Sequence, residues 1–170
     1  MKNSYALITG ATSGIGLEIS KDLAKRGFNL VLVARTKEKL NQTAKELIQE
    51  YNIKCDYFAS DLTLINSPEE IYQFTSKKLY SVDILVNNAG YALPNAFHIN
   101  SMEDEEKCIR LLGTSVIALT KKYINDMISN GRGKIMIVSS VAAFAPASAL
   151  QALYGPIKTF MNRFSETLNY

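Results

Sequence analysis

Two side chains late in the sequence have the types and spacing of an acid–base pair. Tyr154 and Lys158 are four residues apart, and this separation places them on one face of a helix. A free tyrosine has a pKa of about 10, too high for efficient proton transfer at neutral pH, and a neighbouring ammonium favours the phenolate. The pair fits reversible proton transfer to a small-molecule oxygen. An ordinary surface helix is the alternative for such a pair taken alone.

A glycine-rich segment near the N-terminus has the composition of a phosphate-binding turn. It reads Thr9-Gly10-Ala11-Thr12-Ser13-Gly14-Ile15-Gly16 and lies between an apolar run and a helical pattern. We expect Gly10 to allow a tight turn, Gly14 to admit a pyrophosphate and Gly16 to allow close helix–strand packing. The spacing differs from the common Gly-x-Gly-x-x-Gly fingerprint, so an ordinary glycine-rich turn is the alternative.

The end of the second apolar run favours NADP(H) over NAD(H). NAD sites commonly place an acidic residue here to bind the ribose hydroxyls, and no Asp or Glu occurs between Asn29 and Lys37. Ala34 cannot accept such a hydrogen bond, whereas Arg35 can pair with a 2′-phosphate. Lys37 adds positive charge nearby. The alternative is that Arg35 is a solvated loop residue.

These segments resemble the motifs of the short-chain dehydrogenase/reductase family. The family's T-G-x-x-x-G-I-G matches residues 9–16, its N-N-A-G matches residues 87–90, and its Y-x-x-x-K matches residues 154–158. The motifs occur in the family's order and at similar distances, and they cover nearly the whole chain. The resemblance is to the single-domain, NADP-preferring branch.

The resemblance implies a role for each catalytic side chain. Tyr154 is expected to exchange a proton with the substrate oxygen, and Lys158 to lower the pKa of that tyrosine and hold the nicotinamide ribose. Ser140 is expected to hydrogen-bond the substrate oxygen. Ser140 lies one residue farther from Tyr154 than is usual in the family, so Ser139 remains an alternative.

The resemblance also implies a set of residues that bind the cofactor. Asp61 is expected at the adenine amino group, although it can instead cap the Asp61-Leu62-Thr63 turn. Asn88 can likewise hold neighbouring strands together, and Asn87 is expected on the adenosine-ribose side. The full expected set is Gly10, Thr12, Ser13, Gly14, Ile15, Gly16, Arg35, Asp61, Leu62, Asn88, Ala89, Gly90, Tyr154 and Lys158.

Two further departures from the family pattern bear on activity. Arg110 stands where the family usually has an asparagine that supports a proton relay, and an arginine there is expected to repel Lys158. The family also usually continues well beyond Tyr170, with further strands and a substrate loop. We therefore expect a truncated or cleaved form, or a sheet completed by another chain, with the fifth strand as an uncovered edge and an incomplete substrate pocket.

The elements that must position these residues alternate along the chain. Strands are expected at residues 5–9, 29–33, 53–59, 82–86 and 134–138. Helices are expected at residues 14–26, 37–50, 68–80, 102–129 and 151–170, the third capped by Ser67 with Glu70 completing a capping box. This alternation predicts a Rossmann-like α/β fold with a doubly wound parallel sheet in three layers, truncated after the fifth strand and its helix. Residues 1–170 are expected to form one NAD(P)-binding domain.

The composition excludes several classes of protein. Nineteen basic and sixteen acidic residues leave a net charge of +3, too weak and dispersed for nucleic-acid binding. The lone His98, more typical of a loop residue than a catalyst, and the distant Cys55 and Cys108 form no metal site. Without a secretory signal or a long apolar segment, the chain is expected to be cytoplasmic, with reduced cysteines and no membrane span.

Three functions remain open at this level. The first is an NADP(H)-dependent oxidoreductase of small-molecule carbonyls or alcohols. The segments expected to border its pocket are fairly apolar, which favours an apolar substrate. The second is a nucleotide-binding regulatory module without turnover, and the third is an inactive fragment. A homodimer or homotetramer through the last two helices follows from the resemblance, although those helices can instead face only their own sheet.

Overall fold

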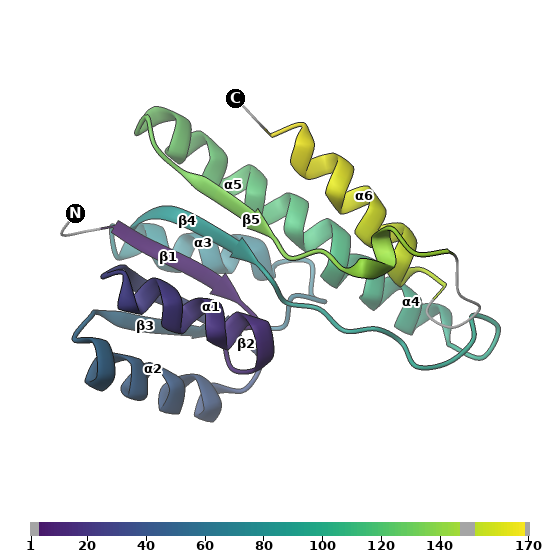
Figure 1. Cartoon of the computed structure of the whole chain (residues 1–170), viewed down its shortest axis with the longest axis horizontal. Helices are drawn as coiled ribbons and strands as arrows, with labels where there is room; N and C mark the ends of the chain where they lie inside the picture. The colour runs from purple at the N-terminus through teal and green to yellow at the C-terminus, as the bar shows by residue number, and fades with distance from the viewer. Residues whose placement is uncertain (1–3, 147–151, 169–170) are drawn as a thin grey trace.

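Five parallel strands form one sheet at the centre of the molecule. The computed structural model describes residues 4–146 and 152–168. The strand order is β3-β2-β1-β4-β5 (Figure 1). The strands are β1 (Ser4–Thr9), β2 (Asn29–Ala34), β3 (Cys55–Ala59), β4 (Ser81–Asn87) and β5 (Lys134–Ile137). The predicted α/β fold with a doubly wound parallel sheet is therefore confirmed. The strand order reverses between β1 and β4, where such folds open a ligand crevice.

Helices cover both faces of the sheet, because successive strand side chains point to opposite sides. On one face, Ile8 and Leu32 pack against α1 (Gly14–Lys25) and α2 (Lys37–Tyr51). On the other face, Leu7 and Leu85 pack with residues of α3 (Ser67–Lys77) and α5 (Ser115–Ser129), as the layers in Figure 1 show. All four of these strand residues are fully buried, and each such side chain contributes about 1.5–3 kcal/mol.

The helix predicted across residues 102–129 is interrupted by a π-helical turn. It consists of α4 (Met102–Ile109), the turn η1 (Arg110–Thr114) and α5. The Ser115 N–H donates to the Arg110 carbonyl, five residues back rather than four. Single π turns inside helices concentrate at functional sites. Here the turn lies against the last helix, since a Cβ on Gly113 would come within 3.8 Å of Ile157.

The predicted capping box at the start of α3 is wrong. Ser67 is the first helical residue and not the cap, which is Asn66. The Ser67 hydroxyl donates to the Asp61 carbonyl at 2.6 Å, so a tertiary bond to the loop after β3 takes the group that a local cap would use. The helix also ends at Lys77, earlier than expected, and Leu79 follows in the left-handed region with a φ of 55°.

Strand β5 is an edge of the sheet, as expected, and one side of it borders a large hollow. Ile135, Ile137 and Val138 are only half-buried, and Met136 is 49% exposed. The hollow has a volume of about 1350 Å³ and lies between α1, the β4–β5 edge and the end of α5. The last helix, α6 (Tyr154–Glu166), packs on η1 and β5, and Ser165 near its end also lines the hollow. Its predicted start at Gln151 falls outside the described residues.

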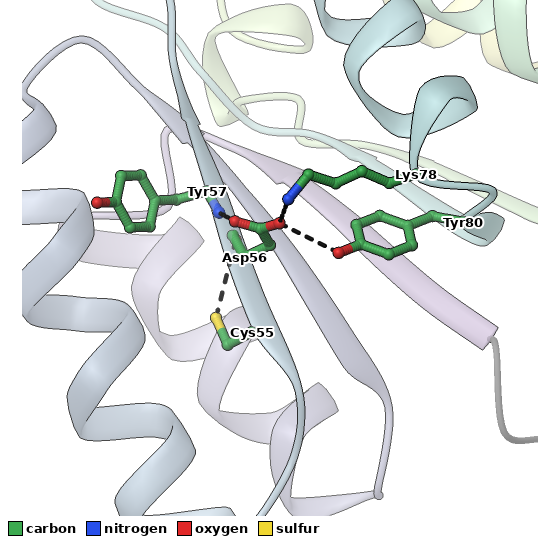
Figure 2. Close-up of polar contacts among 5 residues, drawn as sticks. All are labelled: Cys55, Asp56, Tyr57, Lys78 and Tyr80. Carbon is green, nitrogen blue, oxygen red and sulfur yellow. Dashed lines mark hydrogen bonds and ion pairs between the residues drawn. The ribbon is translucent and has the colours of Figure 1, made fainter.

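A polar cluster ties β3 to the segment between α3 and β4 at the amino end of the sheet. Figure 2 shows the Asp56 carboxylate between the Lys78 ammonium, at 2.5 Å, and the Tyr80 hydroxyl, at 3.1 Å. The Tyr57 N–H donates to the other oxygen at 2.9 Å, and Tyr80 stacks on Tyr5 with ring centroids 4.0 Å apart. Partial burial raises the pKa of Asp56, but these hydrogen bonds outweigh it and hold the pKa below its ordinary value. The cluster anchors the end of the sheet opposite the crevice.

Candidate functional site

The turn between β1 and α1 is held in place by an asparagine from β4's carboxyl end. Gly10 has a φ of +68°, and a Cβ there would come within 2.8 Å of the Asn88 side chain. Asn88 Nδ2 donates to the carbonyls of Thr9 at 2.9 Å and Gly10 at 3.3 Å. Asn88 therefore uses its amide hydrogens to link the end of β4 to the end of β1, which is the strand-linking role considered for it.

Thr9 makes the reciprocal connection from β1 to β4. Its Oγ1 accepts hydrogen bonds from the N–H groups of Asn88 and Ala89, both at 3.0 Å. The same hydroxyl donates to the Val86 carbonyl at 3.3 Å. The Asn87–Gly90 segment is thus fixed against the glycine-rich turn by hydrogen bonds in both directions.

The other two glycines of the turn serve different purposes. A Cβ on Gly16 would overlap both the Gly10 carbonyl and the Asn88 amide, so only glycine lets α1 approach this closely. Gly14 has a φ of +52°, and a Cβ there would meet no atom within 4 Å. Within the described residues, the N-cap Ser13 makes no side-chain bond to the helix, so the first N–H groups of α1 lack that partner. Such a helix start favours an anion.

The carboxyl ends of the strands enclose a cavity of about 490 Å³, which gathers most of the predicted site residues. Gly16 and Ser140 are not among its lining residues, Gly16 because it faces the turn and β4. The predicted residues that line it are Gly10, Thr12, Ser13, Gly14, Ile15, Arg35, Asp61, Leu62, Asn88, Ala89, Gly90, Tyr154 and Lys158. Segments distant in sequence thus converge on one crevice.

One end of the cavity carries basic and hydroxyl groups from β2, α2 and β3. Arg35, Thr36 and Lys39 lie at the end of β2 and the start of α2, and Ser60 follows β3. The Ser60 Oγ is buried and has no partner within the described residues. The sequence analysis did not identify Lys39, although a basic residue in the first turn of the helix that follows Arg35 was a usable signal.

Asp61 forms the turn that was the alternative to an adenine contact. Its Oδ1 accepts from the Thr63 N–H at 2.9 Å and the Thr63 hydroxyl at 2.8 Å. This turn uses one carboxylate oxygen and holds the loop below the cavity. The second oxygen remains for a ligand, so the two roles are compatible.

The opposite end of the cavity holds Tyr154 and Lys158 on the first turns of α6. The Lys158 ammonium lies 5.7 Å from the centroid of the Tyr154 ring and donates to the Val138 carbonyl at 2.6 Å. Lys158 is only 6% exposed. Burial lowers its pKa, and Cys108 opposes the shift. A buried ammonium beside a half-exposed phenol is thus held in position by a backbone carbonyl.

Two serines follow β5, and their hydroxyls differ in environment. Ser140 Oγ accepts a hydrogen bond from the Ala142 N–H at 3.1 Å and caps the short 3₁₀ turn η2 (Val141–Ala143). Because this bond uses a lone pair, the Ser140 O–H remains able to donate. Ser139 lines the cavity, and its Oγ is buried without a partner within the described residues.

Arg110 does not contribute to the pKa shift of Lys158. The groups that perturb this lysine are its own burial and Cys108, which lies just before Arg110 on the neighbouring turn. Arg110 is half-buried in the π turn, where its carbonyl accepts from Ser115. The expected repulsion between Arg110 and Lys158 therefore finds no support in the electrostatics of the site.

Outside the cavity, His98 and the two cysteines are the remaining candidates for chemistry. His98 is an exposed residue of the loop after β4, and both cysteines are free thiols. Over residues 4–146 and 152–168, no three metal-ligating side chains cluster. Within the same ranges, no helix has both the length and the hydrophobicity to cross a bilayer.

Comparison with known proteins points to one family. The model of the short chain dehydrogenase family matches residues 4–170. A fatty acyl-CoA reductase of Acinetobacter baylyi is 34% identical over 99% of this chain, which covers 57% of that protein. A very-long-chain 3-oxoacyl-CoA reductase of Anas platyrhynchos is 34% identical over 98% of this chain and 54% of its own length. The chain thus spans little more than half of these curated relatives.

Solved structures agree with the sequence relatives. A bulky-bulky ketone specific alcohol dehydrogenase from Comamonas testosteroni superposes with a TM-score of 0.92 and 32% identity, over 99% of this chain and 67% of that one. A short-chain dehydrogenase from Sphingobium yanoikuyae in complex with NADPH superposes with a TM-score of 0.91 and 33% identity, over 98% and 65%. The shared portion includes the crevice and all the elements around it.

Proposed function

This chain belongs to the short-chain dehydrogenase family, and from that premise we propose that it carries the NADP(H) site and the Tyr-Lys pair of an oxidoreductase acting on carbonyls or alcohols. One observation carries the proposal. A single cavity brings together the glycine-rich turn, Arg35 and the Tyr154–Lys158 pair from segments far apart in the sequence. Because the chain spans little more than half of its curated relatives, the enzymatic activity is proposed for the whole protein and not only for these residues.

The residues present fit a nicotinamide dinucleotide. The start of α1 offers N–H groups and a positive dipole end to a pyrophosphate, and open space around Gly14 leaves room for close approach. Arg35 lies at the cavity's basic end, where a 2′-phosphate would be held, and Asp61 keeps an oxygen for the adenine amino group. When bound, the cofactor supplies or accepts the hydride.

The chain's own residues handle the proton. In the reducing direction, Tyr154 donates its phenolic proton to the carbonyl oxygen, and in the oxidising direction it accepts that proton. The nearby ammonium of Lys158 stabilises the phenolate that remains. Ser140 donates a hydrogen bond to the same oxygen, because its own lone pair is engaged by the Ala142 N–H. These groups stabilise charge as it develops on the oxygen.

We propose an apolar carbonyl compound as the substrate class. The two curated relatives named above are reductases of acyl-CoA substrates, and a solved relative acts on bulky ketones. Two segments were predicted to border the pocket, residues 91–98 after β4 and residues 141–150 after β5. Phe97 in the first and Val141 and Phe144 in the second are exposed apolar side chains. These residues are consistent with an apolar chain beside the reacting carbon.

Calorimetric titration with NADPH and NADH tests the proposal directly. We expect NADPH to bind more tightly, and Arg35→Ala to remove most of that preference while NADH binding persists. Turnover of medium-chain ketones and aldehydes is then followed by the absorbance of NADPH. Failure of the folded chain to bind either cofactor, with native circular dichroism, would count against these residues as a working nucleotide site.

A second candidate, a nucleotide-binding module without turnover, is favoured by Arg110 alone. This side chain replaces the expected asparagine in the π turn beside Lys158. Arg110→Asn should raise turnover several-fold if the relay is damaged in this chain. Unchanged turnover with unchanged cofactor affinity would show that the substitution is neutral.

A further inference from the structure

We propose that Glu105 is a positioning residue for the apolar part of a carbonyl substrate. It acts by holding Asn100, and so fixes the segment of residues 91–100 that leads from the cavity to α4. The inference rests on the proposed function, because it assigns a role at the boundary of the same cavity. Neither the motifs nor the family resemblance singles out Glu105 or Asn100.

The segment between β4 and α4 starts in the cavity and ends on a helix beside it. Gly90 and Tyr91 line the cavity, and the chain then extends beyond the carboxyl end of the sheet before it turns back into α4 (Figure 1). Its start is fixed, since the Thr9 hydroxyl accepts from the Ala89 N–H at 3.0 Å. Phe97, in the middle of the segment, is an exposed apolar side chain. The position of Phe97 therefore depends on how the far end of the segment is held.

A single side-chain amide holds this far end to α4. Asn100 Nδ2 donates to Glu105 Oε1 at 2.9 Å and to the Asn95 carbonyl at 3.5 Å. The amide thus joins a carboxylate of the helix to the backbone of the segment. Because Asn95 is two residues before Phe97, the Asn100–Glu105 bond restrains the part of the segment that carries this apolar side chain.

Glu105 is buried, although a carboxylate is normally exposed. It is only 3% exposed, and burying an anion is unfavourable unless hydrogen bonds compensate. The start of α4 does not require it, because Ser101 Oγ caps the helix by accepting from the Asp104 N–H at 3.1 Å. Lys107 pairs with Glu103 instead, and no ion pair among the described residues includes Glu105. The carboxylate is therefore available to Asn100 and is not used for capping or ion pairing.

The buried face of α4 continues from Glu105 towards the proton-transfer pair. Cys108 lies three residues further on, so it shares that face, and it is only 1% exposed. Its thiol is close enough to Lys158 to oppose the fall in pKa that burial causes in this lysine. Leu111, in the π turn that follows, lines the cavity. One helix face thus connects the catalytic lysine with the carboxylate that holds Asn100, which positions the segment relative to the reacting groups.

The first test measures ketone binding separately from cofactor binding. Calorimetry gives the Kd of NADP⁺ and, with NADP⁺ saturating, the Kd of 2-octanone, a pair that cannot exchange a hydride. We expect Glu105→Ala to weaken 2-octanone roughly tenfold and NADP⁺ less than twofold. Glu105→Gln keeps an acceptor oxygen for Asn100 and should bind both within about twofold of the wild type. Glu106→Ala is the matched control, since it removes the same charge from an exposed position of the same helix.

Hydrogen exchange tests the Asn100–Glu105 bond without any ligand. Amides of residues 91–100 should exchange about tenfold faster in Glu105→Ala and in Asn100→Ala, and at wild-type rates in Glu105→Gln. The double variant should exchange no faster than either single variant, because each substitution removes the same bond. Asn100→Ala keeps the helix side chain in place, so it decides the question if Glu105→Ala does not fold.

The outcomes separate this inference from the function on which it rests. Equal effects of Glu105→Ala and Glu106→Ala would overturn it, as would a loss in Glu105→Gln as large as that in Glu105→Ala. An equal loss of NADP⁺ affinity would overturn it too, because that indicates general destabilisation. If the chain binds NADP⁺ but the variants leave ketone affinity unchanged, or no ketone binds, the nucleotide site stands and the inference fails. Absence of NADP⁺ binding in the folded wild type overturns the proposed function and the inference together.

Discussion

Lys158 is both buried and able to carry a charge, and burial disfavours that charge. The residue is 6% exposed, and its ammonium donates to one backbone acceptor, the Val138 carbonyl. Burial penalises the charged form, so its pKa in the folded chain lies below the ordinary 10.5. The position is therefore maintained at some cost in stability, as expected for a group retained for chemistry.

The pH dependence of stability should reveal this cost. Because the folded pKa is the lower one, the unfolded chain binds more protons in the window just below 10.5, and Lys158 makes stability rise with pH there. Replacing Lys158 with Met removes that contribution. Denaturant unfolding between pH 7 and 10 should show a less positive slope in Lys158→Met than in the wild type. Turnover of Lys158→Met should fall at least a hundredfold.

The exposed Lys25 provides the control for this measurement. Lys25→Met, at the end of α1, should leave both the slope and turnover unchanged. An identical pH slope in the wild type and Lys158→Met would contradict the assignment of a buried, desolvated ammonium.

The two serines after β5 give a second prediction at the scale of single residues. In the proposed function, Ser140 donates its O–H to the substrate oxygen, so Ser140→Ala should lower kcat by about a hundredfold with little change in cofactor affinity. Ser139→Ala, which removes only a buried hydroxyl without a described partner, should lower kcat less than threefold. Steady-state kinetics and calorimetry on both variants decide between them. The reverse order of effects would make Ser139 the substrate-binding serine.

The Asp56 cluster joins strand β3 to the segment between α3 and β4, so its effect is on the packing of elements. Asp56 accepts from Lys78, Tyr80 and the Tyr57 N–H (Figure 2). Its pKa is lowered in the folded chain, so it stabilises the fold above its ordinary value of 3.8, and this contribution is lost as pH falls through the folded pKa.

Asp56→Asn should therefore lower the free energy of unfolding by about 1 kcal/mol at pH 7. The difference from the wild type should shrink as pH falls below 3.8 and through the folded pKa, because the wild-type carboxylate is progressively protonated in that window. Urea unfolding at pH 7 and at pH 3.5 measures both quantities. A difference that stays constant across this range would mean that the charge of Asp56 contributes nothing.

At the scale of the whole molecule, the edge strand β5 and the hollow beside it form the least covered part of the sheet. Met136 pairs with Val86 in register and lines the hollow, where it is 49% exposed. Uncovered strand edges with apolar side chains favour association between chains. We therefore expect copies of this chain to associate through β5 more readily than through other parts of their surface.

A charge on this edge should reduce association with little effect on stability. Met136→Lys is expected to lower concentration-dependent light scattering and to change the free energy of unfolding by less than about 1 kcal/mol. Ile48→Lys is the matched control, since Ile48 is 43% exposed on α2 and away from the hollow. Equal scattering for Met136→Lys and the wild type would show that the edge does not drive association.

The sequence by itself determined the alternation of strands and helices and the positions of the motifs. Apolar runs and helical periodicity depend on neighbouring residues, so each expected strand lies within two residues of its predicted ends. Parallel pairing then places the ends of β1, β2, β3 and β4 at one edge of the sheet, where a crevice follows from topology. The family and the crevice were predictable for this reason.

Only the tertiary structure decided which polar atoms meet. Ser67 donates to the Asp61 carbonyl instead of capping its helix, and Asn88 uses its amide hydrogens on Thr9 and Gly10. The π turn before Ser115 and the entry of Lys39 into the cavity likewise depend on how helices sit against the sheet. Apart from the Ser67–Asp61 bond, which closes a loop of a few residues, these outcomes are contacts between segments far apart in sequence or placements of whole helices. A local sequence pattern carries no information on such distances.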